Sequence, residues 1–104
     1  MLFLCFACNQ RSGHYNKKIS RSKMVQVLAD MHICDAIAEN NSKGKREIAY
    51  IKAKLYSDKI FSIHNISKKD FDETYEYYIH HPREMDELND QVIQEITKRE
   101  SKLK

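Results

Sequence analysis

The chain has 104 residues, of which 41% are hydrophobic and 32% charged, and its net charge is +3. This length allows one small domain with a thin core, and this composition excludes a disordered chain. Two glycines and one proline argue against a turn-rich sheet protein and favour long helices. The sequence therefore predicts a single all-α domain.

The charges are segregated along the chain. Between Arg11 and Lys69 there are 13 basic and 5 acidic residues, whereas between Asp70 and Lys104 there are 5 basic and 10 acidic residues. A basic front suits phosphates or anionic lipid headgroups. It is also typical of solvated helix sides that an acidic half neutralises, and we favour this second interpretation.

The first eight residues form a short apolar run that ends in Ala7-Cys8. The run is shorter than the roughly 20 residues that span a bilayer, and it looks like the tail of an export signal. Ala7-Cys8 resembles the end of a bacterial lipoprotein signal, where a peptidase cuts before a cysteine whose thiol carries diacylglycerol. We predict a signal-peptide remnant over residues 1–7, a lipidated Cys8 with a polar tether over 8–18, and a helical domain over 19–104. The alternative is an apolar N-terminus on a cytosolic protein.

The first predicted helix begins after Ser20, which has the position of an N-cap. Ile19 and Met24 have the spacing of a hydrophobic staple around it. The helix ends near Asn40-Asn41, since asparagine tolerates left-handed backbone geometry. The apolar stripe expected to face the core is Met24, Val27, Leu28, Met31, Cys34 and Ala38.

A basic hinge, Lys43-Gly44-Lys45, precedes a second helix from about Arg46 to His64. This helix is long enough to lie along the first one as an antiparallel hairpin. Its expected core stripe is Ala49, Ala53, Tyr56, Ile60 and Ile63, broadened by Ile48, Ile51 and Leu55.

The next stretch carries the strongest local signal in the sequence. Asn65 suits the end of the second helix, and Ser67 with Asp70 forms a capping box for the third. Ile66 and Phe71 have the spacing of a second staple. These residues predict that the chain stops one helix, turns and starts another.

Two shorter predictions complete the bundle of about four helices. The third helix runs from about Lys68 to His80 and is rich in tyrosine. Pro82 suits the first position of a C-terminal helix. The third helix carries Phe71, Tyr75 and Tyr78 at helical spacing, and the fourth presents Met85, Leu88, Val92 and Ile96.

Taken together, these residues resemble a known family. The pattern comprises Ile-Ser-x-x-x-Met at 19–24, Leu28-Ala-Asp30-Met-His32, Tyr56-x-x-x-Ile60-Phe61-x-x-His64-x-Ile66-Ser67, Phe71, Tyr75-x-Tyr77-Tyr78 and Pro82. It is similar to small lipoproteins of Bacteroidota catalogued as domain of unknown function 4296, over about Ile19 to Ile96. The resemblance implies an export signal with lipidation, an all-α domain and no established activity, and it supplies no catalytic residues.

Asp35 is the most informative polar residue for chemistry. It lies four residues after Met31, close to the apolar stripe, so we expect it to be partly buried. His32 shares its helix face, and the two side chains could form an acid–base pair in a small pocket. The alternative, which we favour, is a polar contact that fixes the register of the helices.

Metal and redox chemistry find little support in the sequence. Cys5 and Cys8 form a C-x-x-C pair, but no βαβ unit surrounds it and no second pair completes a zinc site. The histidines lack the spacing of metal ligands, and His80-His81 diverge on a helix. We therefore predict no metal, no cofactor and no catalytic residue, and we expect Cys34 to be a small core residue.

The six tyrosines exceed what a thin core requires. Tyr50 and Tyr77 fall off the main stripes and suit a partner surface, because tyrosine is favoured at interfaces. Ordinary partial burial explains them equally well. The residues that we predict for an interaction surface or a polar network are His32, Asp35, Tyr50, Tyr75, Tyr77 and Tyr78.

The leading hypothesis is a non-enzymatic lipoprotein of the cell envelope, anchored through Cys8 on the periplasmic side or the cell surface. Its helical module would bind another envelope protein or an extended chain, and no nucleic acid is expected. One alternative is an enzyme or metal protein built on His32, Asp35 and a tyrosine. Another is a cytosolic nucleic-acid-binding protein that uses Lys17, Lys18, Arg21, Lys23, Lys43, Lys45 and Arg46.

Overall fold

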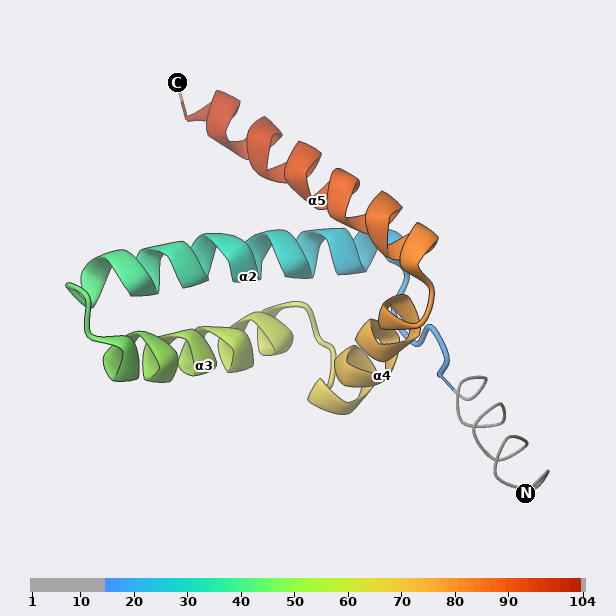
Figure 1. Ribbon diagram of the computed structural model, residues 1–104, viewed down its shortest axis with the longest axis horizontal. Coiled ribbons are helices and arrows are strands. Elements are labelled where there is room, and N and C mark those ends of the chain that lie inside the picture. The colour runs from blue at the N-terminus through green and yellow to red at the C-terminus, as the bar shows by residue number, and fades with distance from the viewer. Residues whose placement is uncertain (1–14, 104) are drawn as a thin grey trace, which may run out of the picture.

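The computed structural model describes residues 15–103, which form an all-α bundle without strands (Figure 1). Cys8 and the predicted signal-peptide remnant lie outside these residues. The helices of the described part are α2 (Arg21–Asn41), α3 (Arg46–Ile63), α4 (Lys68–Ile79) and α5 (Pro82–Lys102). The predicted fold class is confirmed, and the predicted helix ends agree with the structure to within a few residues.

Local capping explains where α2 and α4 begin. The Ser20 Oγ accepts a hydrogen bond from the Lys23 N–H over 3.2 Å, and the Ser67 Oγ accepts one from the Asp70 N–H over 3.0 Å. Each serine satisfies a backbone donor that the first helical turn leaves free. Both predicted N-caps are confirmed.

The turn between α3 and α4 closes with a Schellman motif. Asn65 has a φ of 57°, in the left-handed region, and its N–H donates to the Ser62 carbonyl. The Ile66 N–H reaches back to the Phe61 carbonyl over 2.9 Å. This six-residue closure satisfies the last carbonyls of α3 and turns the chain toward α4.

The helix pair α2 and α3 forms the expected antiparallel hairpin, and α5 packs on another side of α2 (Figure 1). The largest fully buried side chains are Tyr78, Met24, Leu88, Val27 and Thr74. They come from α4 and from the first halves of α2 and α5. The core therefore lies at one end of an elongated molecule that measures 56 × 30 × 24 Å.

One prediction about α3 is wrong. Ile48, Ile51, Leu55 and Ile63 do not face the core; all four are exposed. The reason is that α3 packs against α2 mainly through the narrow side that carries Ala49, Ala53, Tyr56 and Ile60. This side leaves uncovered both the three residues that were expected to broaden the stripe and Ile63, the last residue of the expected stripe.

The segment before α2 packs against the domain from residue 15 onward. The Tyr15 ring stacks on His80 with 4.8 Å between the ring centroids, and the Lys17 Nζ lies 3.1 Å from the Glu84 Oε1. Residues 15–18, which the sequence assigned to the tether, thus contact α4 and α5.

Candidate functional site

The structure does not pair the two residues that suggested acid–base chemistry. His32 and Asp35 are both exposed on α2, so the expectation that Asp35 is partly buried is wrong. Because α3 and α5 cover different sides of α2, the edges of α2 between them remain open to solvent (Figure 1). His32 and Asp35 line different cavities.

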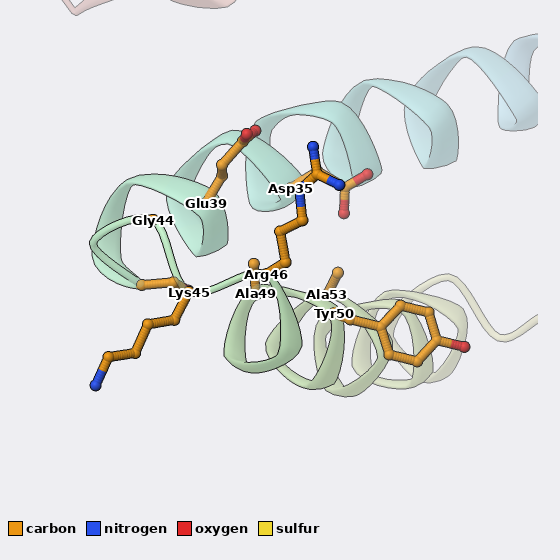
Figure 2. Close-up of a pocket in the computed structure, with 9 residues that line it drawn as sticks. Asp35, Glu39, Gly44, Lys45, Arg46, Ala49, Tyr50 and Ala53 are labelled. Atoms are coloured by element: carbon orange, nitrogen blue, oxygen red, sulfur yellow. The ribbon is translucent and has the colours of Figure 1, made fainter.

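Asp35 and Tyr50 line a cavity of about 320 Å³ beside the α2–α3 turn, which we call the tip pocket (Figure 2). Ala49 and Ala53 leave room between the helices there, and in Figure 2 the Arg46 side chain extends across the cavity toward Asp35. Acidic and basic side chains share this rim: Asp35, Glu39, Lys45 and Arg46. The mixed charge gives the pocket no strong preference for either sign of ligand.

His32 and Tyr75 meet in a second region, which we call the α2–α5 groove. One cavity of about 510 Å³ brings them together with Asn89 and the apolar face of α5. A second cavity of about 320 Å³ continues from His32 and Ile96 toward the end of α5. The residues of the groove are His32, Ile33, Ala36, Ile37, Tyr75, Asn89, Val92, Ile93, Ile96, Arg99, Glu100 and Leu103.

The groove is largely apolar and open. Its aliphatic residues Ile37, Ile93 and Leu103 are all exposed, although they line a concave surface. Exposed aliphatic side chains gathered in a concave surface are typical of protein-interaction sites. Of the residues singled out from the sequence, His32 and Tyr75 therefore belong to the region best shaped for a partner.

A polar cluster that the sequence did not predict joins α2, α3 and α5. The Asp30 carboxylate accepts a hydrogen bond from the His64 Nε2 over 2.6 Å and another from the Arg99 guanidinium. Arg99 also donates to Gln26 over 2.7 Å and to Glu95 over 2.9 Å. We call Asp30, His64 and Arg99 the polar clamp, since it fastens α2 to the end of α3 and to α5.

The clamp holds Asp30 in its charged form. Burial raises the pKa of the Asp30 carboxyl, but the hydrogen bonds from His64 and Arg99 lower it further, so the net pKa lies below its ordinary value. A signal for Asp30 was present in the sequence. It lies three residues after Val27 and four before Cys34, beside the apolar stripe, as Asp35 does with respect to other stripe residues.

Tyr77 and Tyr78 serve the packing of the domain. Tyr78 is fully buried, and Tyr77 is half-buried with its hydroxyl donating to the Glu84 Oε2 over 2.6 Å. The Tyr77 ring stacks on His81 at 3.9 Å between centroids, and the Lys17 ammonium lies 4.9 Å from its centre. The hydrogen bonds from Tyr77 and Lys17 lower the pKa of Glu84. Tyr77 thus belongs to the network that holds residues 15–18 against the domain.

Two of the basic residues considered for nucleic-acid binding are paired with acidic residues of α5. Lys17 pairs with Glu84, and Arg21 lies 3.0 Å from Glu87 and 3.7 Å from Glu84. This is the neutralisation of the basic front by the acidic half that the sequence suggested. It reduces the positive field available to a phosphate backbone at this end of the molecule.

Within residues 15–103 no three His, Cys, Asp or Glu side chains lie close enough together to hold a metal ion. In the same part of the chain, no helix combines the length and the apolar character needed to cross a bilayer. Cys34 is half-buried, and this burial raises the pKa of its thiol, with Asp30 and Asp35 adding to the effect. A thiol with a raised pKa is a poor nucleophile at neutral pH.

The fold and its groove define a small all-α domain with an apolar, concave side and a polar clamp. Residues 15–102 match the family described as a domain of unknown function (DUF4296), and the chain belongs to that family. No curated protein and no solved structure matches the chain.

Proposed function

We propose that this protein is a non-enzymatic lipoprotein of the cell envelope of a member of the Bacteroidota. A lipid on Cys8 anchors it to a membrane, on the periplasmic side or at the cell surface. Its helical domain binds a segment of another envelope protein. The anchor is supported by Ala7-Cys8 at the end of an apolar run, which resembles a processed lipoprotein signal.

The observation that carries the binding function is the α2–α5 groove. Aliphatic side chains line its length, while His32, Arg99 and Glu100 supply polar groups at the rim. An amphipathic helix fits such a groove by placing an apolar stripe in it and its polar face in solvent. We therefore propose an amphipathic helix of the partner as the bound segment.

The anchor is tested by labelling cells with an alkyne-tagged fatty acid. The wild-type protein should become labelled and fractionate with membranes, whereas the Cys8→Ala variant should do neither. Equal labelling of both forms would overturn the anchor.

The groove is tested by placing a photo-crosslinking amino acid at Ile93 of the lipidated protein in intact cells. We expect a discrete protein adduct that an additional Ile37→Glu substitution in the groove removes. The control carries the crosslinker at Ile51, which is exposed on α3 outside the groove. The same adduct from both positions, or none from Ile93, would contradict the proposal.

A further inference from the structure

One flank of α3, beside the narrow stripe that packs on α2, carries apolar and basic residues in a regular order. Lys45, Lys52 and Lys59 recur every seven residues, and Ile48 and Leu55 recur at the same interval. Residues seven apart lie nearly above one another on a helix, since two turns take about 7.2 residues. With Ile51 and Ile63 these residues form one side of the helix, which we call the outer face of α3.

The outer face is open to solvent. Ile51, Leu55 and Ile63 are 58%, 63% and 69% exposed, which is unusual for large aliphatic side chains grouped on one face. Figure 1 shows α3 at the border of the molecule, with α2 on its inner side and α5 beyond α2. The face is separate from the α2–α5 groove, and the proposed partner helix does not cover it.

The lysines of this face are free to meet an external charge. No acidic group of residues 15–103 lies within 4 Å of the ammonium groups of Lys45, Lys52 or Lys59. Glu47 and Asp58, the acidic residues of α3, lie four residues before and seven residues after Ile51, so they border the outer face along its Ile51 edge. The outer face therefore carries apolar and basic side chains, and its two neighbouring carboxylates are confined to one edge.

From this pattern we infer that the outer face of α3 lies on an anionic phospholipid surface. Aliphatic side chains enter the boundary of the acyl chains, while the lysines remain at the level of the headgroup phosphates. A second copy of the chain is a poor occupant, because a symmetric pairing of this face would bring its lysines together.

Chain length is compatible with this contact. Seven residue steps join Cys8 to Tyr15, which span at most about 25 Å when extended. This step rests on the lipid anchor proposed above: with that anchor, the domain stays close enough to the bilayer for one of its sides to touch it. The charge pattern of α3 stands without the anchor.

The test uses the full chain with Cys8→Ser, so that no acyl chain contributes, and vesicles of phosphatidylcholine with or without phosphatidylglycerol at low ionic strength. The chain should partition onto the vesicles that contain phosphatidylglycerol. Each lysine near an anionic surface strengthens binding about fivefold, so a Lys45→Glu/Lys59→Glu variant should bind at least on the order of 25-fold more weakly. The matched control, Lys98→Glu/Lys102→Glu, makes the same charge change at exposed positions of α5 and should change binding much less.

A second measurement locates the contact. The chain has no tryptophan, so Leu55→Trp places a single fluorophore on the outer face and Leu103→Trp places one at the end of α5. Anionic vesicles should shift the emission of the first to the blue and leave the second unchanged. The inference would be overturned if the two tryptophan variants showed equal emission shifts, or if the two charge variants lost binding equally. It would also be overturned if binding did not depend on phosphatidylglycerol. It would also be overturned if Lys45→Glu/Lys59→Glu abolished self-association or binding to an acidic protein rather than vesicle binding.

Discussion

Two ends of the molecule contrast in how they are held together. At the packed end, where α4 meets the first halves of α2 and α5, the side chains of Met24, Thr74, Tyr78 and Leu88 are fully buried. At the open end, which comprises the α2–α3 turn and the last turns of α5, the first fourteen residues of α3 include no buried side chain. The α2–α5 groove, the tip pocket and most of the outer face of α3 lie toward the open end.

This contrast suggests that one end of the molecule stabilises the fold and the other provides surfaces for binding. Burial and hydrogen bonding at the packed end supply the stability of a small domain, whose core must be thin. The open end can then expose aliphatic side chains without loss of the fold, and such surfaces are available to partners. Matched substitutions at the packed end and the open end test whether the two ends differ in this way.

The largest effect is expected from Leu88→Ala at the packed end. Leu88 is fully buried, whereas Leu55 on the outer face of α3 is 63% exposed. Truncating Leu88 removes buried methyl groups and leaves a cavity, so the free energy of unfolding should fall by about 2–5 kcal/mol. Leu55→Ala should change it by less than about 0.5 kcal/mol. Urea unfolding followed by circular dichroism measures both free energies. Similar losses in the two variants would contradict the difference between the packed end and the open end.

Next in size is Thr74→Val. The buried Thr74 Oγ1 accepts hydrogen bonds from the N–H groups of Lys18 and Ile19, over 3.0 and 3.2 Å. Valine has nearly the same shape but leaves these donors without an acceptor, so we expect a loss of about 1–3 kcal/mol. Thr97→Val, at an exposed position of α5, is the control and should be close to neutral. Equal stability of the two variants would show that residues 15–19 contribute little to the fold.

Asp30→Asn tests the polar clamp against the exposed Asp35. Losing the charged partner of His64 and Arg99 should cost about 1–2 kcal/mol near pH 7, whereas Asp35→Asn should be nearly neutral. Because the folded pKa of Asp30 is lowered, its contribution is complete above the unfolded pKa of about 4 and is lost as the pH falls through the folded value. The difference between wild type and Asp30→Asn should therefore shrink below about pH 4. A difference that stays constant down to pH 2 would contradict this account.

The smallest effects concern helix starts, and they should have opposite signs at the two ends. Ser67 caps α4 with its side chain, whereas Lys45 at the start of α3 makes no side-chain capping bond. Ser67→Ala should destabilise the domain by about 1 kcal/mol. Lys45→Ser should stabilise it by up to about 1 kcal/mol, as measured by thermal unfolding. A loss of stability in Lys45→Ser would mean that this lysine has a structural role.

Much of the fold was predictable from the sequence because its determinants are local. Ser20, Asn65, Ser67 and Pro82 act within a few residues of their own positions, through capping bonds and preferred backbone angles. The regular apolar stripe of α2 was also sufficient to predict its core side. These features are the same in any tertiary arrangement that contains the helices.

The candidate site was only partly predictable. His32 and Tyr75 were singled out, but their meeting in one groove depends on how α4 and α5 cross α2. Asp35 was expected to be partly buried because it lies near the α2 stripe, yet that edge of α2 is left uncovered. Asp30 also lies beside the apolar stripe of α2, so its spacing does not distinguish it from Asp35. Only the packing of neighbouring helices buries Asp30 partly and leaves Asp35 exposed.

By itself, the sequence determined the four helices of residues 15–103, their ends and their antiparallel first pair, because capping and periodicity are short-range effects. Tertiary structure alone decided the polar clamp, since Asp30 meets His64 and Arg99 from 34 and 69 residues away. It also decided that Ile51 and Leu55 face solvent. A helix with apolar residues on more than one side can bury only the side that a neighbour covers, and the position of that neighbour is set by the whole chain.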